Sequence, residues 1–139
     1  MATTVLYTPD VLGLAIELAR YPLSDALPLR GEARSKSCGS TIVLGLSTSA
    51  DGTVERIGVR SQACAIGQAS AAIFASAAAG ADAARIVRAR DAIAAWLSGD
   101  GELPDWPGLE TIAAARDYPA RHGAVLLPWN AACQALAPD

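Results

Sequence analysis

Two cysteines, Cys38 and Cys64, lie where the sequence predicts that a loop meets a regular element. Cys38 directly precedes a predicted strand, and Gly39 beside it lets the backbone turn. Cys64 directly precedes a predicted helix, whose unpaired N–H groups and positive dipole end favour a thiolate. A thiolate is both a nucleophile and a metal ligand, so two thiols that meet at one end of a sheet predict metal or sulfur chemistry. The same spacing also suits two buried small hydrophobic residues.

The third cysteine, Cys133, is predicted to pack in the core. One apolar helical face is formed by Trp129, Ala132, Cys133 and Leu136. Three cysteines are an odd and sparse set, which does not make a disulfide framework. Free or metal-bound thiols in a reducing cytoplasm fit this set better, and a disulfide between the other two cysteines stays open if they lie within bridging distance.

The elements that must position these thiols predict an α+β fold, because one helix is followed by strands and then by further helices. The first helix begins at the Thr8-Pro9-Asp10 cap and ends at Pro22. An antiparallel meander of about three strands follows, and Asp51-Gly52 predicts a hairpin with a primed turn. The strands are expected at 31–35, 41–47 and 53–59, and the later helices at 65–79, 82–97, 109–116 and 128–136. The expected architecture is a small three-stranded sheet packed against about four to five helices.

Composition excludes several classes of protein. The formal net charge is −3, with 11 basic and 14 acidic residues, which argues against a nucleic-acid binder. Hydrophobic residues make up 52% of the chain, so wholesale disorder is excluded. The uncharged run 61–81 is mostly alanine and predicts a buried helix, not a membrane span. Residues 1–10 show no secretory signal, so we expect a cytoplasmic protein whose single domain spans 1–139.

Four stretches of the sequence together resemble a known family. They are Ser37-Cys38-Gly39-Ser40, the hairpin, Cys64-Ala65-Ile66 with Gln68-Ala69-Ser70, and Tyr118-Pro119-Ala120-Arg121 with Leu127-Pro128-Trp129-Asn130. The Cys-Ala-Ile-x-x-Ala-Ser element is the most specific of them. With Leu6-Tyr7 they cover nearly the whole chain, and they resemble the NifU-type (IscU/SufU-like) iron–sulfur cluster scaffold proteins.

This resemblance implies a scaffold or carrier and not an enzyme. In the family, three cysteines and an aspartate at one exposed end of the sheet hold a zinc ion or a nascent [2Fe–2S] cluster. A cysteine can accept sulfur from a cysteine desulfurase, and the cluster passes to recipient apo iron–sulfur proteins. Cys38 and Cys64 match the first two cysteine positions, so the resemblance implies that both bind iron or the cluster.

Two of the four ligand positions differ from the family pattern. Ser40 stands in place of the aspartate, and Ala124 stands in place of the third cysteine. Two thiolates supply only two of the four ligands of a tetrahedral metal site. If residues 121–124 are extended, His122 points to the same side as Ala124 and is a candidate ligand. The alternatives are that His122 is an exposed loop residue, or that a second subunit in a homodimer supplies the missing thiolates.

Three functions remain open at this point. The first is an iron–sulfur cluster assembly scaffold that uses Cys38 and Cys64. The second is a degenerate paralogue that binds no metal and regulates a partner. The third is a sulfur acceptor, in which one of the two cysteines carries a persulfide without building a cluster.

Overall fold

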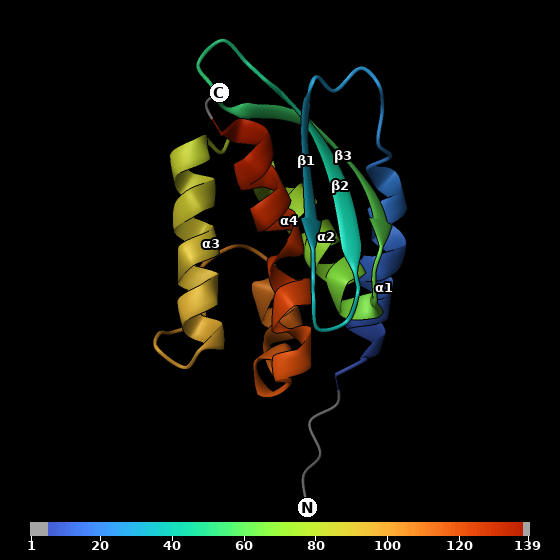
Figure 1. Cartoon of the computed structure of the whole chain (residues 1–139), viewed down its shortest axis with the longest axis vertical. Coiled ribbons are helices and arrows are strands. Elements are labelled where there is room, and N and C mark those ends of the chain that lie inside the picture. Colours follow the sequence, from blue (N-terminus) through green and yellow to red (C-terminus); the bar gives the residue numbers. More distant parts are fainter. Residues whose placement is uncertain (1–5, 138–139) are drawn as a thin grey trace, which may run out of the picture.

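The chain forms a three-stranded antiparallel sheet, ordered β1-β2-β3, with helices against it (Figure 1). A computed structural model describes residues 6–137. The strands are β1 (Leu29–Arg34), β2 (Thr41–Thr48) and β3 (Val54–Gln62). The α-helices are α1 (Pro9–Glu17), α2 (Ala65–Ala78), α3 (Ala83–Leu97) and α4 (His122–Leu136), and short 3-10 helices lie at Leu18–Arg20, Leu109–Asp117 and Pro119–Arg121. The predicted α+β fold is therefore confirmed.

Alternation along the strands decides which face of the sheet is buried. Ile42, Leu44 and Leu46 point to the same side of β2 and are at most 1% exposed. Both α2 and α4 pack on the sheet and on each other, and the Ser70 hydroxyl of α2 donates a hydrogen bond to the Val125 carbonyl of α4. At the two sides of this layer, α1 packs on α2 and α3 packs on α4 (Figure 1).

The alanine-rich run predicted to be a buried helix forms α2, which follows the end of β3. Phe74 of α2 stacks on Trp106 and meets Trp129 edge-on, with ring centroids 5.4 Å apart in both pairs. The Trp106 indole N–H donates to the Ile73 carbonyl, 3.1 Å away. These tryptophans are therefore packing anchors. In the part of the chain that the structure describes, no helix is long and apolar enough to cross a membrane.

Gly31 allows α4 to come close to β1. A Cβ atom on Gly31 would collide with the backbone carbonyl of Ala131. At this close approach, Gln134 of α4 accepts a hydrogen bond from the Glu32 backbone N–H, 2.5 Å away. The free edge of β1 is therefore partly covered by a helix.

The β2–β3 hairpin exists as predicted, but its turn is not a two-residue primed turn. Gly52 has a φ of +84°, whereas no residue other than glycine has a positive φ in the described chain. The Asp51 carboxylate instead accepts hydrogen bonds from the Ser49 hydroxyl and from the hydroxyl and backbone N–H of Thr53. These bonds lower the pKa of Asp51 to about 2.

The last helix begins earlier than predicted, at His122 and not near Pro128. Pro128 lies inside α4, where it cannot donate a hydrogen bond to the Ala124 carbonyl. Its neighbours Leu127 and Trp129 are nevertheless buried in the core. Tertiary packing therefore outweighs the local tendency of proline to begin or end a helix.

Candidate functional site

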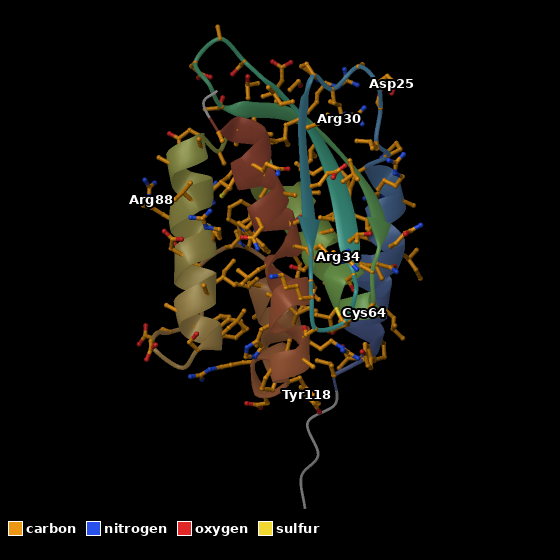
Figure 2. All side chains as sticks on the ribbon, viewed as in Figure 1. Asp25, Arg30, Arg34, Cys64, Arg88 and Tyr118 are labelled. Atoms are coloured by element: carbon orange, nitrogen blue, oxygen red, sulfur yellow. The ribbon has the colours of Figure 1, made fainter. Side chains whose placement is uncertain are left out.

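Cys38 and Cys64 lie at the same end of the sheet. Cys38 belongs to the β1–β2 loop, and Cys64 is the N-terminal cap residue of α2, directly after β3. Figure 2 labels Cys64 at the lower end of the sheet, beside that loop. Both thiols are half-buried and free.

The hydroxyl of Ser40 joins the two cysteines. Ser40 Oγ lies 3.1 Å from Cys38 Sγ, and it accepts a hydrogen bond from the Cys64 backbone N–H at 3.2 Å. Ser40 itself is only 3% exposed. Because the hydroxyl oxygen accepts from Cys64, its own proton is free to point at a Cys38 thiolate.

Short-range bonds fix the loop that carries Cys38. The Ser35 N–H donates to the Ser40 carbonyl, and the Gly39 N–H donates to the Ser35 carbonyl, both at 2.8 Å. Gly39 has a φ of +70°, as its expected role in the turn requires. The Ser37 hydroxyl donates to the carbonyl of Ala120, 2.9 Å away, which ties the loop to the segment before α4. Cys38 is thus held in a defined place.

The environment of Cys38 favours its thiolate. Partial burial on its own would raise the pKa of Cys38. Hydrogen bonds with Ser35 Oγ and Ser40 Oγ, the Ser40 backbone and the charge of Arg121 outweigh that burial and lower the pKa to about 7. Ser35 Oγ lies 3.2 Å from the sulfur. The Cys38 thiolate therefore forms at a lower pH than that of an ordinary cysteine.

The positive charge of Arg121 acts on both cysteines. Its Nε–H donates to the Tyr7 hydroxyl at 3.2 Å, which orients the guanidinium. This bond to Tyr7, with smaller contributions from the charges of Cys64 and Cys38, raises the pKa of Arg121. The guanidinium can therefore balance negative charge that builds up on the two sulfurs.

Ala124, which the resemblance places at the position of the third family cysteine, has no side-chain donor atom for a metal. It is fully buried. A Cβ atom placed on Gly67 would lie 3.7 Å from the Cβ of Ala124, so Ala124 packs against the first turn of α2, which Cys64 caps. Residue 124 therefore faces the helix that Cys64 caps, but its side chain is only a methyl group.

The geometric argument for His122 as a ligand is wrong. Residues 119–121 form a 3-10 helix and His122 begins α4, so 121–124 is helical and not extended. His122 Nε2 lies 2.7 Å from the Arg116 carbonyl oxygen, which can only accept, so this nitrogen carries a proton. The alternating strand pattern that would have aligned His122 with Ala124 does not exist here.

Cys133 packs against the core from α4, as its position on the apolar helical face predicts. It lies about 16 Å along the helix axis from His122. Burial raises the pKa of Cys133, which makes it a poor nucleophile. It is a natural control for the other two thiols.

Within residues 6–137, no group of three or more histidine, cysteine, aspartate or glutamate side chains could hold a metal ion. The arrangement therefore offers two soft thiolate ligands, one of low pKa, with a neutral hydroxyl between them and a guanidinium beside them. It can accept a sulfur atom, or provide half of the ligands of an iron–sulfur cluster.

Sequence reasoning did not predict the roles of Ser35 and Tyr7. Ser35 reaches Cys38 only because the loop closes on itself, and Tyr7 reaches Arg121 across most of the chain. Arg121 did have a signal in the sequence, because it lies three residues before the position of the third family cysteine.

Comparisons with known proteins place this geometry in context. The N-terminal part of a nitrogen-fixing NifU-like protein from Brucella abortus is 31% identical, with a TM-score of 0.84 over 94% of this chain and 92% of that one. SufU from the thermophile Fervidobacterium islandicum AW-1, described as a candidate iron–sulfur cluster assembly scaffold for the SUF system, is 18% identical. Its TM-score is also 0.84, over 94% of this chain and 96% of that one. No family model matches the sequence, and no curated protein matches it.

Proposed function

Because the chain belongs to the NifU-like (IscU/SufU-like) family of iron–sulfur cluster scaffold proteins, we propose that it assembles a cluster on Cys38 and Cys64 and passes it on. The observation that carries this proposal is the pair of cysteines joined through Ser40 at one end of the sheet. Thiolates are the ligands that iron–sulfur clusters prefer. Iron and sulfur are the cargo, so the protein acts as a carrier and not as an enzyme.

Sulfur reaches the site from a cysteine desulfurase. The Cys38 thiolate attacks the terminal sulfur of the donor persulfide, whose S–S bond breaks as a new S–S bond forms on Cys38. The donor leaves as a thiolate, so this step needs no oxidant or reductant. Reduction of the transferred sulfur to sulfide then takes two electrons from a dithiol reductant, and ferrous iron binds the two thiolates. Recipient apo iron–sulfur proteins accept the product, in the reducing cytoplasm that three free cysteines suit.

Anaerobic loading with ferrous iron and sulfide tests this function. We expect a coloured protein that contains equal amounts of iron and sulfide. Cys38→Ser and Cys64→Ser should each abolish the colour. Cys133→Ser should keep it, because Cys133 belongs to α4, whereas Cys38 lies in the β1–β2 loop and Cys64 caps α2. A Cys38→Ser/Cys64→Ser double variant that still binds iron and sulfide would overturn the proposal.

A second candidate function is favoured by the lowered pKa of Cys38. A sulfur carrier needs one reactive thiol and not four ligands. Incubation with a cysteine desulfurase, cysteine and ferrous iron would then add one sulfur atom to the Cys38 peptide, as seen by mass spectrometry, and the protein would bind no iron. Binding of the desulfurase with neither sulfur nor iron uptake would instead indicate a regulator.

A further inference from the structure

We infer that the cavity beside the two cysteines binds a small α-amino acid that carries a thiol, such as free L-cysteine, and that its sulfur provides a ligand that the chain lacks. This inference rests on the proposed function and adds a small-molecule partner at the same site. It starts from a mismatch between what a cluster requires and what one chain offers. A [2Fe–2S] cluster takes four ligands.

The chain itself offers two suitable ligands at this end of the sheet. Over the described residues, no third histidine, cysteine or carboxylate joins Cys38 and Cys64 to make a metal site. The Ser40 hydroxyl is already bonded to the Cys64 N–H, and Ala124 has no donor atom. Cys133 packs against the core from α4. A further soft ligand must therefore come from outside the chain.

A cavity of about 480 Å³ lies beside this incomplete site, and its volume is that of a small-molecule site. Its wall includes Ala120, whose carbonyl accepts a hydrogen bond at 2.9 Å from Ser37, the residue before Cys38. Figure 2 shows Tyr118, another residue of the wall, at the same lower end of the molecule as Cys64. A molecule in this cavity is therefore close to the two thiols.

Two opposite charges line the cavity, the guanidinium of Arg121 and the carboxylate of Asp117. In the part of the chain that the structure describes, neither of them belongs to an ion pair. The Nε–H of Arg121 donates to the Tyr7 hydroxyl, so the outer N–H groups can reach the carboxylate of a ligand. Asp117 can accept hydrogen bonds from an ammonium group. This pair of charges fits the carboxylate and the ammonium of a free amino acid.

The rest of the wall suits the side chain of such a molecule. It is formed largely by Leu6, Tyr7, Tyr118 and Pro119, which offer apolar and aromatic contacts to a methylene group and a sulfur atom. The charge of Arg121 also acts on both cysteines, so a carboxylate held by Arg121 keeps the amino acid at their end of the sheet. Its thiol then loses a proton and binds iron as the cysteines of the chain do.

The test measures how fast the loaded protein loses iron to a ferrous chelator. The chain is loaded anaerobically with ferrous iron and sulfide, with a phosphine as reductant, and one thiol at a time is added at rising concentration. L-Cysteine should slow the loss of iron, whereas S-methylcysteine, which keeps both charges but has no free thiol, should not. At equal thiolate concentration, L-cysteine should act at about a tenfold lower level than 2-mercaptoethanol, from two exposed charge contacts of about threefold each.

Two variants separate the two charges of the cavity. Asp117→Asn should raise the required concentration of L-cysteine and of cysteamine about threefold, and leave 3-mercaptopropionate, which has no ammonium, unchanged. Arg121→Met should weaken L-cysteine and 3-mercaptopropionate relative to 2-mercaptoethanol, and leave cysteamine unchanged on that scale. The matched control is Asp105→Asn, which alters an exposed carboxylate at a different cavity beside α3 and should change none of these values.

Several results would overturn the inference and leave cluster binding intact. They are equal protection by all four thiols in the wild type and both variants, protection by S-methylcysteine, and better protection by glutathione than by L-cysteine. The charged groups of glutathione lie farther from its sulfur, so that last result would mean that a free amino acid is not the occupant. Absence of any bound iron and sulfide would overturn the proposed function as well.

Discussion

A serine between two cysteines differs physically from an aspartate in that place. A hydroxyl both donates and accepts hydrogen bonds, whereas a carboxylate only accepts and carries a negative charge. Ser40 accepts from the Cys64 N–H and lies 3.1 Å from Cys38 Sγ, so it can donate to a thiolate there. A carboxylate would repel that thiolate and raise its pKa. The residue at this position thus favours an ionised sulfur and gives up a metal ligand.

The first prediction concerns the reactivity of Cys38. Its alkylation by iodoacetamide should rise with pH through a midpoint near 7, because the thiolate forms there and not at the ordinary 9.0. Ser40→Ala removes one hydrogen bond to the thiolate, worth about 1 kcal/mol, and should slow alkylation at pH 7 by about threefold. The rate is measured by mass spectrometry of the Cys38 peptide.

The Cys133 peptide of the same samples is the internal control, since burial raises the pKa of that thiol. It should react slowly in both proteins. A wild-type Cys38 midpoint close to 9 would contradict the hydrogen-bonding geometry described for the loop.

At the scale of elements, the loop 35–40 and the beginning of α4 are held together by close contacts of two serine side chains. Gly123 lies so near Ser35 that a Cβ atom on it would come within 2.6 Å of the Ser35 hydroxyl. The Ser37 hydroxyl bonds the Ala120 carbonyl on the same side. The site is therefore built between two elements that are far apart in the sequence.

The second prediction compares alanine substitutions at two glycines, one crowded by a neighbouring helix and one with open space around it. Gly31→Ala should destabilise the protein by about 1–3 kcal/mol, because its Cβ collides with the Ala131 carbonyl and α4 must move. Gly13→Ala, in the middle of α1 with open space around it, should stabilise the protein by about 0.5–1 kcal/mol. Urea unfolding measures both changes, and equal effects would contradict this account of the packing.

The cap of α3 gives a third prediction. The Asp82 carboxylate accepts a hydrogen bond from the Arg85 N–H at 2.8 Å. Asp82→Ala should lower the free energy of unfolding by about 1 kcal/mol, while Asp82→Asn should preserve most of it. Thermal unfolding of the two variants separates the cap from other roles, since only the alanine lacks an acceptor.

The elements could be predicted from the sequence wherever their signals are local. The β-branched, apolar run 41–47 and the Asp82 cap each act over a few residues, and both predictions were met. The hairpin at Asp51-Gly52 also formed, but without the predicted primed turn. The predicted start of the last helix near Pro128 was wrong. The burial of Leu127 and Trp129, which depends on distant elements, outweighs the local preference of proline for a helix end. The bonds of Ser35 and Tyr7 in the site likewise depend on the folded chain and could not be predicted.

At the scale of the whole molecule, the cargo should stabilise the fold that binds it. Under the proposed function, iron and sulfide would contact the β1–β2 loop and the beginning of α2, so their binding would oppose unfolding of both. When the free cargo is at a hundred times its dissociation constant, the free energy of unfolding rises by about 2.7 kcal/mol, which corresponds to a rise of about 8 °C in Tm.

Differential scanning calorimetry of the loaded and the apo protein checks this fourth prediction. Removal of iron with a strong ferrous chelator should return Tm to the apo value, and Cys133→Ser should show the same rise as the wild type. An unchanged Tm in a protein that carries iron and sulfide would mean that the cargo sits outside the folded core.

The approach of α4 to β1 also bears on how copies of this chain can meet. Strands with open backbone groups at a sheet margin invite another chain to extend the sheet, which is a common route to fibrils. The Gln134 side chain accepts a hydrogen bond from the Glu32 N–H, and the backbone of Ala131 lies close against Gly31. Edge-to-edge pairing with another chain is therefore hindered at Glu32, in the middle of this strand.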